Sequence, residues 1–291
     1  MGKYIVGLDE GTTGCKTCIF DLDGNLIGSD YREYPCIYFP DHPGWVEQSD
    51  KEITPALYAS IKSAIAKSGI NTDDIICLGL SSQGAVLGMV DKDGVPVHNF
   101  VSWQDCRCFE MTEELLSRID ADEFYRITGW NPYSTAPVLR HLWLQKHKPE
   151  IYYDKTAMFV TNQEFYLKQL GADGWFVDSS SVCREAIGDL KTHDYSQRIF
   201  DVAGMDLSKR NPRVPHGAPV GQITQKLHEL TGLPVGCMIC VGAMDQDCSP
   251  LGCGNIREGD TAIVMGTYGA CFICSDSIPY APRPSRLMVK S

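Results

Sequence analysis

The sequence has no apolar stretch long enough to cross a bilayer as a helix, and it is poor in basic residues. None of its hydrophobic runs approaches the roughly 20 residues that a membrane-spanning helix needs. It carries 26 Lys and Arg against 37 Asp and Glu, a net charge of −11. This balance argues against a nucleic-acid groove or an anionic membrane surface as partner. The chain also begins without a basic and apolar leader, so we expect a cytoplasmic location.

Internal repeats, low-complexity segments and the Gly-x-x-x-x-Gly-Lys-Ser/Thr phosphate loop are also missing. No metal-site or catalytic-triad spacing is seen at the histidines His42, His98, His141 and His147. Thirteen cysteines are present, and three Cys-x-x-Cys pairs fall within strand-like runs. Residues three apart on a strand face opposite sides, so these pairs do not favour a metal site. Reduced thiols that act as small buried hydrophobic groups are expected instead.

The hydrophobic pattern predicts an α/β fold with a mixed sheet. The chain has 291 residues with 43% apolar and 22% charged content, typical of one large or two modest globular domains. Strands are expected near residues 4–8, 17–20, 26–36, 75–80, 85–90, 159–160, 220–223 and 237–241. Helices are expected up to about residue 67 and over 108–119, 121–127, 137–146, 164–169 and 226–231. Strands grouped early that then alternate with helices favour this fold class.

The start of the first long helix has two alternatives. The first long helix begins either at a capping box formed by Ser49 and Glu52 or with Pro55 at its first position. Downstream, the chain from Trp175 to about Ser196 is expected to be mostly loop.

The stretch Tyr4–Gly24 is typical of a strand, a tight polar turn and a second strand. Its apolar run ends at Asp9, and small residues follow that let backbone N–H groups approach an anion. The hydroxyls of Thr12 and Thr13 add donors, and Lys16 adds positive charge. Asp9 at the strand end can hold a hydrated Mg²⁺ ion. An ordinary β-hairpin with a polar turn is the alternative.

A second strand ends in a glycine turn within residues 238–254 and opens a helix near Asp245. A negative charge at a helix N-terminus is stabilised by the helix dipole, so a simple N-cap aspartate is one interpretation. Asp247, two residues further on, is the nearest alternative carboxylate to Asp245. Further on, Thr261–Cys274 repeats the strand, Gly/Thr turn and strand of the first hairpin.

Taken together, these stretches resemble the motifs of the FGGY carbohydrate kinases, within the hexokinase and actin superfamily. Gly44–Gln48 is similar to a Gly-Trp-x-Glu-Gln stretch of that family. The resemblance implies a ribonuclease-H-like mixed sheet flanked by helices, the first half of a duplicated two-domain sugar kinase fold. It implies a substrate and phosphate domain over residues 1–255, with residues 256–291 beginning an incomplete nucleotide-binding domain.

The same resemblance assigns roles to individual residues. Asp245 matches the catalytic base, and Gln246 takes the adjacent substrate-contacting place. Asp9 matches the aspartate that acts on Mg²⁺ through water. The ATP phosphates would meet Thr12, Thr13, Gly14, Lys16, Gly266 and Thr267. Gly14 stands where a serine is frequent in the family.

The expected substrate region combines Gln83 and Trp103, which match retained family positions, with Tyr133, which resembles a tyrosine of the glycerol kinases. A core aromatic residue is the alternative for Trp103. Gly84 and Ala85 stand where glycerol kinases carry an arginine and a glutamate that bind glycerol. This small pair is expected to leave room for a bulkier acceptor, or for one held from elsewhere.

The resemblance therefore implies ATP-dependent phosphorylation of a sugar, ketose or sugar alcohol, with ATP and Mg²⁺ as cofactors. Asp245 would orient the acceptor hydroxyl and take its proton, and the two hairpins would clamp the phosphates. The alternative is a truncated, non-catalytic sugar-binding or regulatory module. Expected partners are a small sugar or polyol, with no nucleic acid or membrane. The apolar residues of the second hairpin would pack onto the first domain, mediate self-association or leave the tail mobile. A homodimer is also expected.

Overall fold

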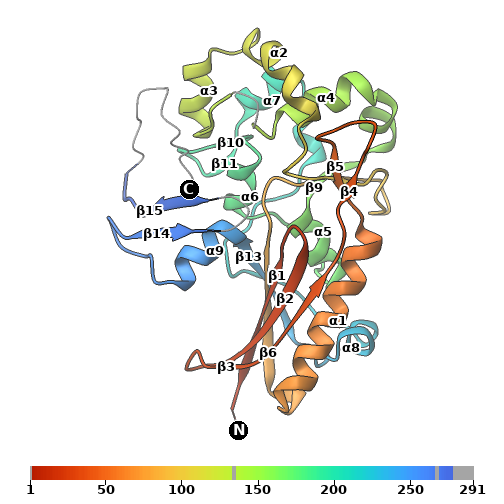
Figure 1. Cartoon of the computed structure of the whole chain (residues 1–291), viewed down its shortest axis with the longest axis vertical. Helices are drawn as coiled ribbons and strands as arrows, with labels where there is room; N and C mark the ends of the chain where they lie inside the picture. Colours follow the sequence, from red (N-terminus) through yellow and green to blue (C-terminus); the bar gives the residue numbers. More distant parts are fainter. Residues whose placement is uncertain (1, 133–135, 266–268, 278–291) are drawn as a thin grey trace.

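The computed structural model describes residues 2–132, 136–265 and 269–277 (Figure 1). A six-stranded sheet runs through the lower part of that view, with strand order β12-β13-β6-β1-β2-β3. Its strands are β1 (Tyr4–Glu10), β2 (Gly14–Asp21), β3 (Leu26–Glu33), β6 (Ile75–Ser82), β12 (Pro219–Gln222) and β13 (Met238–Met244). β1, β6 and β13 are parallel, whereas β2, β3 and β12 pair antiparallel with their neighbours. The predicted mixed sheet is confirmed.

Helix α1 (Asp50–Ser68) packs along β2 and β3 and carries the apolar stripe predicted from its spacing. The side chains that it buries are Ile53, Leu57, Ile61, Ala64 and Ile65, with Ser60 among them. Ser49 caps the helix by accepting a hydrogen bond from the Lys51 N–H group, and Gly69 ends it in the left-handed conformation. Pro55 lies inside the helix, so a start at Pro55 is wrong.

A second, five-stranded antiparallel sheet has the strand order β4-β5-β8-β7-β9. Its strands are β4 (Ile37–Tyr38), β5 (Val46–Gln48), β8 (Phe100–Val101), β7 (Leu87–Val90) and β9 (Met158–Thr161). The helices α2 (Thr112–Leu116), α3 (Ala121–Thr128), α4 (Leu139–His147) and α7 (Gln197–Ala203) gather in the upper part of Figure 1. Their apolar faces form one core cluster, and the six-stranded sheet with α1, α5 (Asn162–Gln169) and α8 (Gln225–Thr231) forms the other.

The segment expected to be a loop after Trp175 is partly ordered secondary structure, so that expectation is wrong. Helix α6 (Ser179–Arg184) and the short strands β10 (Gly188–Asp189) and β11 (Asp194–Tyr195) lie within it. Asp178 caps α6, and the segment buries the apolar side chains Val182, Ile187 and Leu190. The helix is too short for a periodic pattern to reveal it, and its order comes from this burial. Likewise, the helix expected over 108–119 is a 3₁₀ segment, Arg107–Met111, followed by α2.

The thirteen cysteines stand as free thiols, of which Cys15, Cys108, Cys183 and Cys237 are buried. Cys106, Cys253 and Cys271 are exposed, so the expectation of burial holds for only part of the set. Within the described residues, no three metal-ligating side chains of the His, Cys, Asp and Glu types are grouped closely enough to hold an ion. In the same residues, no helix has the length and apolar content required to span a membrane.

The chain continues from α9 (Asp245–Gly252) into a separate two-stranded hairpin, β14 (Thr261–Val264) and β15 (Ala270–Ile273). This hairpin lies beside α9 at the edge of the molecule (Figure 1). Ile263 and Ile273 are 68% and 65% exposed. These two apolar side chains therefore do not pack onto the first domain.

Candidate functional site

The carboxyl ends of the three parallel strands bring the predicted carboxylates to one edge of the sheet. Asp9 is the penultimate residue of β1 and is paired with Ser81 on β6, while Asp245 directly follows β13. Parallel strands end at the same edge, and ligands of open α/β sheets bind there. Asp9 and Asp245, which are 236 positions apart in the sequence, are close enough to repel each other electrostatically.

This electrostatic environment perturbs Asp9. Displacement of water by packed atoms and, second, the negative charge of Asp245 together raise the pKa of Asp9 from 3.8 to about 6. The nearby Ser81 hydroxyl and the positive charge of Lys16 oppose this rise. The carboxylate still reaches solvent at the sheet edge. Two repelling carboxylates at a solvent-accessible edge would both gain from a bound cation, so the donor set fits a hydrated Mg²⁺ ion.

The turn after β1 closes through a hydrogen bond from the Gly11 N–H group to the Gly14 carbonyl, 3.0 Å long. A Cβ atom at Gly14 would lie 2.5 Å from the Tyr31 hydroxyl oxygen and 2.6 Å from the Arg32 carbonyl oxygen. This chain therefore has no space for a serine at the position where the family frequently has one. Thr12 is half-buried, and Thr13 and Lys16 are exposed, so all three remain available on the surface of the turn.

A buried polar network supports this turn from beneath. Glu10 is fully buried, and burial raises its pKa well above the usual value. The Gln83 side-chain nitrogen donates to the Glu10 carboxylate at 2.7 Å and to the Gly11 carbonyl at 3.0 Å. The Gln48 side chain donates to the Thr12 carbonyl at 2.8 Å. Gln83 thus supports the turn with its nitrogen, while its side-chain oxygen is buried without a hydrogen-bond partner among the described residues.

Trp103 links the expected substrate region to the phosphate turn. Its indole N–H donates to the Thr12 hydroxyl at 2.9 Å. Arg140, which is fully buried, donates to the Trp103 carbonyl at 3.0 Å and to the Ala85 carbonyl at 2.6 Å. Ala85 has a φ of 58°, in the left-handed region that non-glycine residues rarely adopt. Arg140 therefore holds both loops of the expected substrate region in place.

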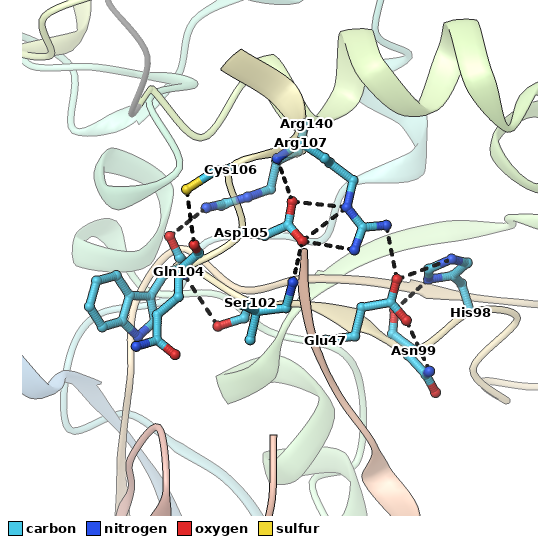
Figure 2. A network of polar contacts seen from close by, with 11 residues as sticks. Glu47, His98, Asn99, Ser102, Gln104, Asp105, Cys106, Arg107 and Arg140 are labelled. Carbon is cyan, nitrogen blue, oxygen red and sulfur yellow. Dashed lines mark hydrogen bonds and ion pairs between the residues drawn. The ribbon is translucent and has the colours of Figure 1, made fainter. Parts of the chain in front are cut away.

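The Gly-Trp-Val-Glu-Gln stretch is anchored by Arg107, as Figure 2 shows for its polar partners. Arg107 contacts Glu47 at 2.9 Å and Asp105 at 2.8 Å, and its guanidinium lies 4.1 Å from the centre of the Trp45 ring. Asp105 also accepts a 2.6 Å hydrogen bond from the Val46 N–H group. These contacts fix strand β5, so that its last residue, Gln48, reaches the phosphate turn.

Gly84 does not open space for an acceptor, and that expectation is wrong. A Cβ atom there would lie 2.2 Å from Met244 Sδ and 2.6 Å from Arg184 Cγ. The volume that a larger residue would use is already filled by these two side chains. The Arg184 guanidinium itself lies 4.7 Å from the centre of the Trp130 ring.

Asp245 is the first residue of α9, and its carboxylate accepts a 2.7 Å hydrogen bond from the Gln246 N–H group. Asp245, Gln246 and Asp247 are all half-buried. The remaining predicted site residues, Tyr133, Gly266 and Thr267, lie outside the described residues. Sequence reasoning missed Glu10, Gln48 as a support of the turn, and Arg140. The Gly-Trp-Val-Glu-Gln resemblance was the one signal that could have indicated Gln48.

The fold has close parallels among known structures. The chain superposes on the crystal structure of a gluconate kinase from Lactobacillus acidophilus with a TM-score of 0.85 and 25% identity, covering 93% of this chain and 54% of that one. A xylulose kinase from Rhodospirillum rubrum gives a TM-score of 0.88 at 22% identity, over 97% and 57% of the two chains. The fold is therefore that of the sugar kinases, the actin-like ATPase fold.

Sequence comparison gives the family. Residues 4–252 match the FGGY family of carbohydrate kinases, N-terminal domain, and the chain belongs to this family. It is 27% identical over 267 residues to an autoinducer-2 kinase of Escherichia coli, covering 91% of this chain and 50% of that protein. It is 29% identical over 272 residues to a glycerol kinase of Thermococcus gammatolerans, covering 92% and 53%. The chain spans about half the length of these relatives.

Proposed function

We propose that the protein containing this chain transfers the γ-phosphoryl group of ATP to a hydroxyl of a sugar, ketose or sugar alcohol. The observation that carries this proposal is the approach of Asp9 and Asp245 at one sheet edge, beside the small-residue turn at 11–14. Phosphoryl transfer needs positioning and charge stabilisation more than covalent chemistry, and this arrangement can supply both. Family membership and the named relatives support the same reaction class.

In this proposal Asp245 is the general base. The acceptor oxygen forms a bond to the γ-phosphorus while the bond to the ADP leaving oxygen breaks, and the hydroxyl proton passes to the Asp245 carboxylate. A base acts on the hydroxyl only within hydrogen-bond reach, which the start of α9 would provide if the sugar binds beside Trp103 and Gln246. Asp247, two residues further along the helix, faces another direction.

Asp9 would hold hydrated Mg²⁺, which supplies the positive charge that the ATP phosphates require. Thr12 and Thr13 lie on the adjacent turn and Lys16 lies on β2 opposite Asp9, and their hydroxyl and ammonium groups can bind phosphate oxygens. Thr267 and its glycines would close the phosphates from the second hairpin. Residues 1–255 would form the substrate and phosphate domain, and residues 256–291 would begin the nucleotide-binding domain.

The test uses the full-length protein and a panel of sugars and polyols in a coupled assay of ADP formation. We expect turnover with at least one sugar, and absence of turnover with every compound would refute the proposal. Asp245→Asn should lower kcat by roughly 10²–10⁴-fold with little change in sugar affinity, because the base acts on the transition state. Asp247→Asn is the matched control and should keep near-normal kcat. The reverse ranking would assign the base to Asp247.

The second candidate is a non-catalytic sugar-binding module. We expect the 291-residue chain alone to bind ATP weakly and to turn over negligibly, because sugar kinases of two domains assemble their site by closure. Isothermal titration with ATP and Mg²⁺ checks this. Submillimolar binding together with sugar phosphorylation by this chain would show that the nucleotide site lies within it.

A further inference from the structure

A buried carboxylate lies behind the strand end that carries Asp245. The Asp178 side chain is fully buried at the start of α6 and accepts hydrogen bonds from the hydroxyls of Ser180 and Ser181, the second of them 2.6 Å long. The Ser181 N–H group also donates to it at 3.1 Å, and His216 Nε2 lies 3.1 Å away. These partners hold the pKa of Asp178 below its usual value despite the opposing effect of burial. Asp178 therefore stays charged and fixes both serine hydroxyls.

Only one of the two serines reaches the strand. The Ser180 hydroxyl oxygen accepts a 3.0 Å hydrogen bond from the Met244 N–H group. Met244 is the last residue of β13 and directly precedes Asp245. The pairing of β13 with β6 is irregular between Val241 and Met244. The regular hydrogen bonding between β13 and β6 is thus interrupted just before Asp245. The Ser180 side chain from α6 supplies the acceptor for the Met244 N–H group there.

Glycine at position 242 makes this irregular end possible. A Cβ atom at Gly242 would lie 2.2 Å from the Leu80 carbonyl oxygen and 3.3 Å from the Ser81 nitrogen. The strands β13 and β6 approach closely there. Asp245 is consequently placed by two restraints, the close contact with β6 at Gly242 and the hydrogen bond to Ser180 at Met244.

We propose that Ser180, held by Asp178, is a positioning residue that sets the direction of the Asp245 carboxylate. This inference rests on the proposed role of Asp245 as general base. A misplacement of a catalytic group by about 1 Å can cost on the order of 10²-fold in rate, so a single backbone hydrogen bond adjacent to the base has a measurable effect.

The same cluster is not a nucleophilic triad. The Ser179 hydroxyl lies 3.2 Å from His216 Nε2, and Asp178 lies 3.1 Å from that same nitrogen. A Ser-His-Asp relay needs the serine and the carboxylate on different ring nitrogens. His216 is 44% exposed at its side chain, and the hydrogen bond to Asp178, aided by the charge of Asp247, raises its pKa. Its role is to balance the charge of Asp178.

The kinetic test compares Ser180→Ala with Ser181→Ala in the full-length protein. Both variants remove a hydroxyl donor to Asp178, but only Ser180→Ala removes the acceptor of the Met244 N–H group. We expect Ser180→Ala to lower kcat roughly 10- to 100-fold at unchanged sugar KM, and Ser181→Ala to stay within about 3-fold. Ser180→Thr, which keeps the hydroxyl, should restore kcat. Equal kcat losses in the two alanine variants would overturn the proposal.

A second measurement does not depend on activity. Amide hydrogen exchange at Met244, followed by NMR in the 291-residue chain, should accelerate at least 10-fold in Ser180→Ala and remain close to wild type in Ser181→Ala. Unchanged exchange in Ser180→Ala would overturn the positioning role even in an active kinase. If the wild-type protein phosphorylates no sugar, the proposed function fails, and the exchange result still decides whether Ser180 fixes the strand end.

Discussion

Replacement of Asp9 by asparagine should stabilise the folded chain above pH 6. It should also remove the carboxylate that would bind hydrated Mg²⁺. The pKa of Asp9 is raised from 3.8 to about 6 in the folded state, first by loss of surrounding water and then by Asp245. Between these two values the folded chain binds more protons than the unfolded chain, so its stability falls as pH rises. Asparagine resembles the protonated acid and does not ionise, so the Asp9→Asn chain does not lose this stability as pH rises.

The expected size follows from the shift. About two pKa units correspond to ~3 kcal/mol for a fully desolvated group, and solvent screening of the exposed Asp9 carboxylate reduces this to about 1 kcal/mol. The difference in the free energy of unfolding between Asp9→Asn and wild type should therefore be near zero below pH 3.8 and reach its full value above pH 6. About two thirds of this pH-dependent change in the free energy of unfolding should occur between pH 4.5 and 7.5.

Urea unfolding of the 291-residue chain at a series of pH values measures this difference in the free energy of unfolding. Asp41→Asn, which makes the same charge change at an exposed loop residue, is the matched control for the loss of one carboxylate. The gain from Asp9→Asn should shrink in an Asp245→Asn background, because the repelling charge is gone. A difference that stays constant across pH, or a less stable Asp9→Asn chain at pH 7.5, would refute the reasoning.

Three further outcomes are expected. Gly84→Ala should lower the free energy of unfolding by roughly 1–3 kcal/mol, since the added methyl group meets Met244 and Arg184, and urea unfolding in a Met244→Ala background should recover part of the loss; an unchanged midpoint would show that the two side chains move aside freely. Arg140→Met should cost roughly 2–4 kcal/mol in the same assay, because the Ala85 and Trp103 carbonyls lose their buried donor; a loss as small as that of Lys146→Met at an exposed helix position would contradict this. In the full-length protein, glycerol should be phosphorylated with a kcat/KM on the order of 100-fold below that of the best sugar, because position 84 offers no side-chain hydrogen bond; equal values would refute it.

Local sequence patterns predicted a large part of the fold. The apolar stripe of α1, the Gly69 stop and the alternation of early strands with later helices all depend on neighbours in sequence, and each appears in the structure. The turn after β1 and the helix start at Asp245 were predicted for the same reason. Motif resemblance gave the family, which residues 4–252 confirm. The roles of the individual site residues stay predictions.

Patterns failed where segments were short or order came from distant contacts. Helix α6 has six residues, too few for a helical period, and it is held by the capping carboxylate of Asp178. Gly84 was interpreted as open space because sequence neighbours cannot show which side chains arrive from elsewhere. Met244 and Arg184 occupy that space, one from a strand end and the other from α6.

By itself, then, the sequence determined the local elements, the two carboxylates and the family, since helix and strand periods, turn residues and motifs are properties of contiguous residues. Only the tertiary structure decided how these parts support one another. Thr12 meets Trp103 across 91 positions, and Glu10 meets Asn162 across 152. Such contacts arise because parallel strands must return to the same sheet through long crossovers, and the pairing of their ends brings together residues that no local pattern relates.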